Sequence, residues 1–374
     1  MTSGDGPLRL IGETDVRIYG LPAAEWQGRN WRRAGVARAA GTILTRTDWV
    51  FSAGLTMALV GAPGVALVQR SGGHTRLIAA HLPEATKADQ VEAMMSAGSV
   101  DEAALTALGL RVETPETLAG GYNETLRKRE TPFALPIADG GVRDAEQALF
   151  KSAYKGATDL VTKYLWPVPA LAVTRFCAAR RISPNTVTSV SLVFVLMATW
   201  AFWRGDWVTG FVCGWLMTFL DTVDGKLART TLTSSKWGHY FDHGIDWVHP
   251  PFWYIAWYLG IHATVAAPPG WMDTALGVIL VGYVLGRTIE NVFRYIHGFQ
   301  IHVWQPFDYG LRIVTARRNP NTLIFMVFTL FGAPAVGLGA VAVWTVVCTL
   351  LHTVRLITAG FRRAEPPLKS WMAA

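Results

Sequence analysis

Hydrophobic positions are distributed very differently in the two parts of this chain. The second half contains six long apolar runs, whereas the first 140 residues alternate short apolar and polar stretches. Because a helix needs about 20 mostly apolar residues to cross a bilayer, we expect an α-helical integral membrane domain of six transmembrane helices. The runs cover residues 186–203, 207–221, 247–267, 271–293, 322–338 and 339–358. Pro334 is expected to mark the turn between the fifth and the sixth.

The first 140 residues predict a small cytosolic α/β domain. VALVQ (65–69) and LIAAHL (77–82) are typical of short buried strands, and KADQVEAMMSAG (87–98) is typical of a helix. Residues 141–185 interleave aromatic and aliphatic residues with Lys and Arg, which indicates a juxtamembrane amphipathic linker. This linker either lies on the membrane surface or packs on the soluble domain. Ser183 followed by Pro184 predicts the start of the first membrane helix, and the membrane domain covers residues 186–374.

The composition agrees with a membrane protein: 51% of the residues are hydrophobic, 16% are charged and 16 are Trp. The net charge is +7, but the basic residues cluster beside the apolar runs, so we expect anionic lipid headgroups and phosphates as partners and no nucleic acid. Cys177, Cys213 and Cys348 are odd in number and far apart, which excludes a disulfide framework and a zinc site. The N-terminus does not read as a cleavable signal peptide.

Basic residues also predict the orientation in the membrane. The segments 175–181, 226–236, 294–318 and 355–369 are rich in Lys and Arg, whereas the loops at 204–206, 267–271 and around 335 contain only Arg204. Because basic loops stay in the cytoplasm, we expect both termini and the segment after the second run to be cytoplasmic.

The most informative stretch follows the second apolar run. It reads D-x-x-D-G-x-x-A-R, then eight residues, then G-x-x-x-D-x-x-x-D. In helices, Asp221 and Asp224 share one face and Asp242 and Asp246 share another. Unpaired carboxylates at the edge of a bilayer are costly, so Lys226 and Arg229, and above all hard divalent cations, are expected to compensate them. A two-metal site suits displacement at phosphorus.

At every fixed position this motif resembles the signature of the CDP-alcohol phosphatidyltransferase family. The resemblance implies that a hydroxyl attacks a CDP-linked alcohol at phosphorus and that CMP is released. It implies two Mg²⁺ or Mn²⁺ ions on Asp221, Asp224, Asp242 and Asp246, with Asp246 also the general base. It assigns CDP binding to Gly225, Ala228, Arg229, Ser235 and Gly238, and to Asn185 and Thr188 of PNTVT (184–188). The family commonly dimerises through its membrane helices, so a homodimer is expected.

The N-terminal stretches YGLPAAEWQGRNWRRAGV (19–36) and TDWVFSAGLTMALV (47–60) resemble, in outline, nucleotidyltransferase-like domains that precede some phosphatidyltransferases of the inositol-phosphate branch. The Gly-rich loop that would wrap nucleotide phosphates is missing after LRLIG (8–12), so we interpret the domain as degenerate, with a regulatory or structural role. Asp48 is interpreted as an ordinary acid at a strand end rather than a metal ligand. The resemblance favours inositol phosphate as the acceptor and the inner membrane of a bacterium or archaeon. Glycerol phosphate, an amino alcohol and a sphingolipid-type acceptor stay open, and the CDP-alcohol is a lipid or a polyol.

A second charged group lies near the end of the fourth run. Arg287, Glu290 and Arg294 recur on one helical face. Arg287 and Arg294 could form an anion pocket for the acceptor phosphate. Equally well, Arg287 could form an ion pair with Glu290 at the helix end while Arg294 extends toward the membrane surface. The following basic loop, with Arg312, Arg317 and Arg318, either covers the site or binds lipid headgroups, and headgroup binding is the expectation.

Two other functions compete with the enzyme. A divalent-metal transporter would use the four acids as its ion site, but no inverted repeat is visible. A non-catalytic membrane scaffold would not need the acids.

Overall fold

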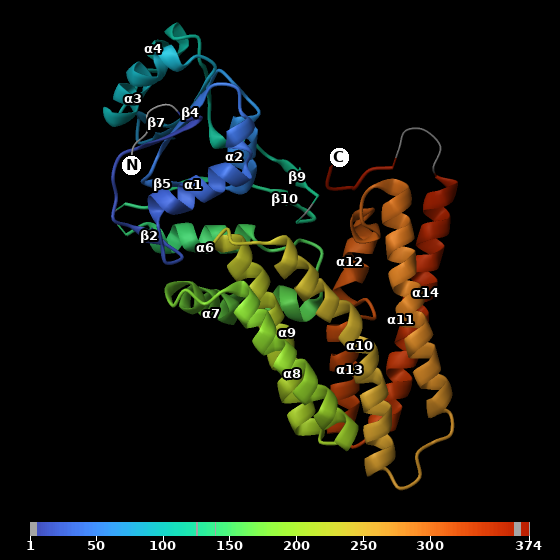
Figure 1. The fold of residues 1–374 in the computed structure, drawn as a ribbon. Coiled ribbons are helices and arrows are strands. Elements are labelled where there is room, and N and C mark those ends of the chain that lie inside the picture. Colours follow the sequence, from blue (N-terminus) through green and yellow to red (C-terminus); the bar gives the residue numbers. More distant parts are fainter. Residues whose placement is uncertain (1–5, 125, 139, 363–367, 374) are drawn as a thin grey trace.

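The chain folds into an N-terminal α/β part and a C-terminal bundle of long helices (Figure 1). The computed structural model describes residues 6–124, 126–138, 140–362 and 368–373. The α/β part sits at one end of the bundle, and two helices, α6 and α7, lie across that end between the two parts. The α/β prediction and the helical prediction are therefore both confirmed.

The N-terminal part is organised around a five-stranded sheet with the order β1-β4-β7-β6-β8. β1 pairs with β4 and β6 with β8 in parallel, and the remaining pairs are antiparallel. The apolar stretches that predicted strands form β6 and β7, whose register places Ala66 opposite Ala80. The strands are β1 Leu8–Ile11, β4 Thr42–Arg46, β6 Val65–Ser71, β7 His74–Leu82 and β8 Arg111–Glu113.

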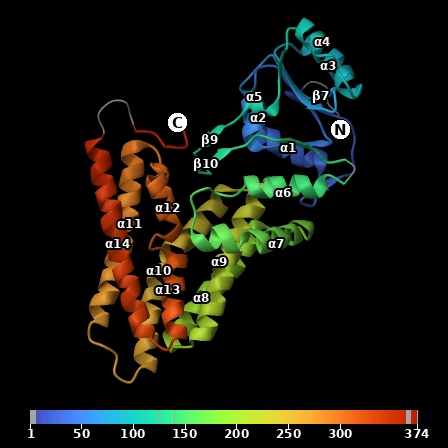
Figure 2. The same cartoon turned by 180° about the vertical axis from the view of Figure 1, so that it is seen from behind.

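Helices and small two-stranded ribbons surround this sheet. The helices are α1 Ala23–Arg33, α2 Ala53–Val60, α3 Ala88–Ser96, α4 Glu102–Ala107 and α5 Pro115–Leu118. The ribbons pair β2 Arg17–Ile18 with β3 Leu21–Pro22, β5 Trp49–Phe51 with β11 Ala134–Pro136, and β9 Gly121–Asn123 with β10 Lys128–Glu130. The β9–β10 hairpin extends away from the sheet toward the bundle and lies beside the C-terminal segment (Figures 1 and 2).

The linker consists of three helical pieces. They are α6 Val142–Ser152, the short helix η3 Val161–Leu165 and α7 Pro167–Ala179. α6 packs its apolar side inward through Leu149 and Phe150, whereas α7 leaves Val168 82% exposed and Phe176 55% exposed. Exposed aliphatic and aromatic side chains of this kind suit contact with a membrane surface.

Among the described residues, five long helices and two shorter ones form the C-terminal part. They are α8 Pro184–Arg204, α9 Trp207–Thr230, α10 Lys236–Thr264, α11 Met272–His297, α12 Pro306–Val314, α13 Arg318–Leu330 and α14 Pro334–Phe361, with a further turn, η4, at Ile301–Val303. As predicted, α8 begins at Pro184, where the Ser183 hydroxyl accepts a hydrogen bond from the Thr186 amide.

The boundaries of the last two predicted runs were wrong. α13 ends at Leu330, and a turn with Gly332 at a positive φ of 73° precedes Pro334, where α14 begins. The division of the two runs between 338 and 339 therefore falls inside α14, whereas the turn itself lies at Pro334, where it was predicted. Within the described residues, three helices are long and apolar enough to cross a membrane, namely α8, α11 and α14.

The two parts of the chain share one hydrophobic core. Trp26 of α1, Phe150 of α6 and Val223 of α9 are all less than 3% exposed and belong to the same cluster. The Trp26 indole also donates a 2.8 Å hydrogen bond to the Thr230 carbonyl at the end of α9. The N-terminal part is therefore packed firmly against the helix that carries the first half of the acidic motif.

Candidate metal centre

The acidic motif folds as its spacing predicts, on the facing ends of two helices. α9 carries Asp221 and Asp224, and α10 carries Asp242 and Asp246. Carboxylate oxygens of Asp221, Asp242 and Asp246 lie within 4.8 Å of one another. One cation can contact all three at such distances, and an all-oxygen donor set is the one that Mg²⁺ and Mn²⁺ prefer.

Asp224 is the fourth acid of the motif, and it is more buried than the other three. It is 3% exposed, and its Oδ2 accepts a 2.6 Å hydrogen bond from the Thr188 hydroxyl of α8. Its Oδ1 is buried and has no hydrogen-bond partner within the described residues. Because a buried carboxylate oxygen without a partner is costly, this orphan oxygen is a second observation that suits a cation ligand.

Arg318, at the start of α13, inserts its guanidinium between the carboxylates. It donates to Asp221 Oδ2 at 2.7 Å and to Asp246 Oδ1 at 2.6 Å. The prediction that this basic loop binds lipid headgroups was therefore wrong for Arg318. The arginine follows Asp246 by 72 positions, and no local pattern marked it as part of the site.

The two cations inside the motif have different surroundings. The Arg229 guanidinium donates to the Ala153 carbonyl at 3.0 Å, and its charge acts favourably on Asp224 and Asp242. Lys226 lies 3.2 Å from the centre of the Tyr154 ring and bonds to the same Ala153 carbonyl. Its interactions run toward the linker, so the expectation that Lys226 compensates the acids was wrong.

Three of the residues assigned to CDP binding, Asn185, Ser235 and Gly238, lie where α8 meets the start of α10. Gly225, Ala228 and Arg229 lie on α9. Ser235 caps α10 by accepting a 3.0 Å hydrogen bond from the Gly238 amide. A Cβ at position 238 would lie 2.7 Å from Asn185 Oδ1, which is closer than real side chains approach, so glycine lets the two helix ends meet. A Cβ at Gly225 would lie 3.0 Å from the Arg229 guanidinium. Ala228, half-buried between these groups, uses its carbonyl to accept from the Ser234 hydroxyl.

Lys155, in the loop after α6, is a site residue that no motif identified. Burial, helped by the positive charges of Arg127 and Arg229, lowers the pKa of Lys155 from 10.5 to about 8. The negative charges of Asp242 and Asp221 act in the opposite direction. The segment after α6 thus brings an amine with a lowered pKa within electrostatic range of the acids.

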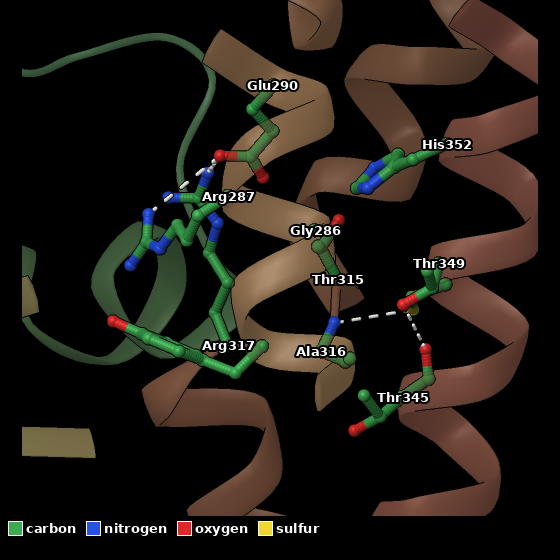
Figure 3. A pocket seen from close by; sticks show the side chains of 12 residues that line it. Gly286, Arg287, Glu290, Thr315, Ala316, Arg317, Thr345, Thr349 and His352 are labelled. Carbon is green, nitrogen blue, oxygen red and sulfur yellow. Dashed lines mark hydrogen bonds and ion pairs between the residues drawn. The ribbon is translucent and has the colours of Figure 1, made fainter. Parts of the chain in front are cut away.

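Arg287 and Arg294, the predicted acceptor residues, are separated by the structure. Arg287 lines a narrow cleft between α11, the segment 315–317 that precedes α13, and α14 (Figure 3). It lies 3.8 Å from Glu290, whereas Arg294 is exposed. Glu290 is also bonded by Arg317 and, at 3.2 Å, by His302. The cleft volume of about 20 Å³ holds little more than one water molecule.

Asp48 behaves as the ordinary acid that was predicted. It forms a 2.7 Å ion pair with Arg46 in the N-terminal part. Cys177, Cys213 and Cys348 are buried free thiols, as expected from their spacing.

Comparison with known families is consistent with this geometry. The family model described as CDP-alcohol phosphatidyltransferase matches residues 181–350, which include all four aspartates and Arg318. Those residues are a CDP-alcohol phosphatidyltransferase domain. The transferase domain begins beside Ser183 and ends within α14, so it excludes the α/β part and most of the linker.

Several characterised proteins are similar to parts of the chain. A phosphatidylinositol phosphate synthase of Streptomyces avermitilis is 33% identical over 113 residues, which are 30% of this chain and 44% of that protein. An archaetidylinositol phosphate synthase of Pyrococcus horikoshii is 31% identical over 78 residues, 21% of this chain and 42% of the relative. Cholinephosphotransferase 1 of Danio rerio is 34% identical over 102 residues, 24% of this chain and 26% of the relative. The aligned segments thus span less than half of each relative. Together with the apolar helices, the transferase domain identifies an integral membrane protein.

Proposed function

We propose that this protein transfers a phospho-alcohol group from a CDP-alcohol to a hydroxyl acceptor, with release of CMP. The observation that carries the proposal is the convergence of Asp221, Asp242 and Asp246 within 4.8 Å, beside the orphan oxygen of Asp224. An all-oxygen donor set of this kind suits hard cations, and the Thr188 hydroxyl of α8 bonds to Asp224 within it.

Asp221, Asp224, Asp242 and Asp246 would hold two Mg²⁺ or Mn²⁺ ions. When bound, such ions neutralise a pyrophosphate and stabilise the departing CMP. Arg229 is placed to assist, because it is the cation of the motif whose charge acts directly on the carboxylates. The proposed nucleotide contacts are Asn185, Thr188, Gly225, Ala228, Arg229, Ser235 and Gly238.

Asp246 is the proposed general base. Its Oδ1 is engaged by Arg318, whereas Oδ2 makes no hydrogen bond within the described residues. Oδ2 can therefore take the proton of the acceptor hydroxyl. As this proton leaves, the acceptor oxygen forms a bond to the phosphorus that carries the alcohol, and the bond from that phosphorus to the bridging oxygen breaks. CMP departs with the electron pair.

The acceptor is proposed to be a phosphorylated polyol of the inositol-phosphate type. Two of the similar proteins are named as a phosphatidylinositol phosphate synthase and an archaetidylinositol phosphate synthase. Arg317, which is adjacent in sequence to the Arg318 that binds Asp221 and Asp246, also supports an anionic acceptor. Arg287 and Arg294 remain proposed contacts for the acceptor phosphate. Arg287 would meet it only if the cleft opened beyond its volume of about 20 Å³.

For the membrane, we propose six spans with the metal centre on the cytoplasmic side. α13 has 13 residues, which at 1.5 Å per residue give a length of about 20 Å. This is shorter than the hydrocarbon core of a bilayer, about 30 Å, so α13 could cross only where the bilayer is locally thinner or where neighbouring helices shield its ends from lipid. An even number of spans places both termini on the same side of the membrane, which we propose is the cytoplasmic side. The terminal residues 1–5 and 374, and residues 363–367, lie outside the described ranges. A homodimer and an origin in a bacterial or archaeal inner membrane belong to the same proposal.

A substrate screen tests this function. Purified protein would be incubated with Mg²⁺ or Mn²⁺, one lipid and one polyol CDP-alcohol, and a panel of acceptors: inositol phosphate, glycerol phosphate, an amino alcohol and a sphingolipid-type acceptor. We expect CMP release that requires both the divalent ion and a phosphorylated polyol. Release that is insensitive to a chelator would contradict the proposed metal centre.

A further inference from the structure

The β9–β10 hairpin connects the N-terminal part to the transferase domain through specific contacts. Arg127 Nη1 donates a 2.7 Å hydrogen bond to Gln300 Oε1, and the Lys128 ammonium bonds to the Ser152 carbonyl at 2.6 Å. The backbone of the hairpin is equally close, because a Cβ at Gly156 would lie 2.3 Å from the Arg127 carbonyl. Arg127 has a positive φ of 54°, a conformation that a non-glycine residue keeps only where its surroundings enforce it.

Behind this hairpin, arginines outnumber acids in a buried space. Arg312 is 8% exposed, and its Nε and Nη1 have no hydrogen-bond partner within the described residues. The Nε atoms of Arg127 and Arg317 are likewise buried without a partner. The charges of Arg127 and Arg317 repel that of Arg312, so the three side chains are near neighbours.

The acids nearby do not balance these cations. Glu290 is bonded by Arg317 and lies 3.8 Å from Arg287, and Asp159 attracts Arg312. The four arginines therefore face two carboxylates. Excess buried charge of one sign is costly unless a counter-ion enters. A phosphate monoester, with a charge of about −1.5 to −2 at pH 7, has the magnitude that is needed.

This cationic cluster adjoins the metal centre. Arg317 and Arg318 are consecutive residues, and the first binds Glu290 while the second binds Asp221 and Asp246. The charge of Lys155 interacts with that of Arg127 in the cluster and with those of Asp221 and Asp242 in the metal centre, so Lys155 is within electrostatic range of both groups. An acceptor bound by its phosphate in the cluster would thus lie beside the proposed base.

We propose that the N-terminal part supplies Arg127 to an anion subsite shared with Arg312 and Arg317, and that this subsite binds the phosphate of a phosphorylated acceptor. The inference rests on the proposed function for the identity of the ligand as an acceptor. It gives the fused α/β part a direct role in substrate selection, since a transferase domain without the hairpin would lack one of the three guanidinium forks.

The test uses the full-length protein and two independent measurements. The first is thermal stability during titration with inorganic phosphate and with inositol phosphate, in detergent without anionic lipid. The second is the KM for the acceptor in CMP release. For Arg127→Gln we expect the half-saturating phosphate concentration and the acceptor KM to rise about ten- to a hundredfold, with a smaller change in kcat.

Arg129→Gln is the matched control. It removes the same charge from the same hairpin, but Arg129 is exposed and donates to the Met372 carbonyl, so it should leave both values unchanged. Arg127→Lys retains the charge without the planar fork and should give intermediate values. It also keeps the test decisive if Arg127→Gln does not fold.

Each outcome is informative. A wild-type response to phosphate that Arg127→Gln and Arg127→Lys both retain would overturn the subsite, even if CMP release is normal. A response to nanodiscs containing phosphatidic acid, with none to soluble phosphates, would overturn the acceptor assignment. Arg127-dependent binding of phosphate in a protein that releases no CMP would instead support the subsite and remove the proposed function.

Discussion

The guanidinium of Arg318 lies 2.6 Å from Oδ1 of Asp246 and also bonds to Asp221. These two carboxylates belong to the candidate cation site. Arg318 and a divalent cation would therefore compete for the same carboxylate oxygens, since either one can neutralise their negative charge. If a divalent cation were held by these carboxylates, we would expect Arg318 to give up part of this contact, and its guanidinium could then bind a substrate phosphate.

Replacing Arg318 should consequently alter metal binding. In Arg318→Gln the cation no longer competes with a guanidinium, so we expect a dissociation constant for Mn²⁺ about tenfold lower, equivalent to about 1.4 kcal/mol. CMP release should nevertheless fall. Calorimetric titration of Mn²⁺ measures the first effect directly. Arg180→Gln, which changes an arginine at the end of α7 away from the acids, is the control, and equal affinities in the two variants would contradict the competition.

The hydrogen bond from Thr188 to Asp224 predicts a metal defect. In Thr188→Val the carboxylate loses the group that orients it, and losses of this kind typically cost about ten- to a hundredfold in metal affinity. We expect the Mn²⁺ concentration for half-maximal CMP release to rise by that factor. Thr199→Val is matched, because its hydroxyl bonds only to the Val195 carbonyl of the same helix. If both variants had the same metal requirement, Thr188 would have no orienting role.

Gly238 and Gly244 form a natural pair on α10. In Gly238→Ala the new methyl group would meet Asn185 at 2.7 Å, whereas no atom lies within 4 Å of a Cβ at Gly244. Alanine in an open helical position stabilises by about 0.5–1 kcal/mol, so Gly244→Ala should raise the melting temperature slightly. Gly238→Ala should lower it and raise the KM for the CDP-alcohol. A Gly238→Ala protein with unchanged stability and KM would refute the close approach.

Lys155 predicts a pH-dependent stability. Because its pKa is lowered to about 8 in the folded protein, the unfolded chain binds more protons between pH 8 and 10.5. Folding therefore carries a penalty from Lys155 that is fully present below pH 8 and disappears as the pH rises to 10.5. Lys155→Met should melt at a higher temperature than the wild type at pH 7 and at nearly the same temperature at pH 10, while its CMP release at pH 7 falls. A difference in melting temperature that does not depend on pH would contradict this assignment.

Site residues that lie close together in the sequence could be predicted, whereas those that lie far apart in the sequence could not. The four aspartates share a 26-residue stretch at helical spacings, so local geometry was enough to bring them together. Arg318 and Arg127 reach the site only through tertiary packing, and neither spacing nor composition distinguishes them from other surface arginines. Lys226 lies inside the motif but does not take part in the acidic cluster. Its position on α9 faces the linker, so its ammonium contacts the Tyr154 ring instead.

The domain boundaries follow the same physical reasoning. The α/β part contains only short apolar stretches and the C-terminal part contains long ones, so the sequence predicted both parts. The shared core of Trp26, Phe150 and Val223 was not predictable, because each of these residues also suits an ordinary core within its own segment. Pro334 correctly marked the turn between the last two apolar runs, but the boundary drawn between the runs at 338 and 339 was too late, because apolar residues continue past the turn.

The central claim is that the acidic motif carries out phospho-alcohol transfer, and release of CMP by Asp246→Asn tests it most directly. With a CDP-alcohol, a phosphorylated polyol and Mn²⁺, we expect the substitution to reduce the rate by about a hundredfold or more, because the base is lost. Asp144→Asn on the exposed side of α6 should retain the wild-type rate. A full rate in Asp246→Asn, or a wild-type protein that carries divalent ions across vesicles without releasing CMP, would contradict the account.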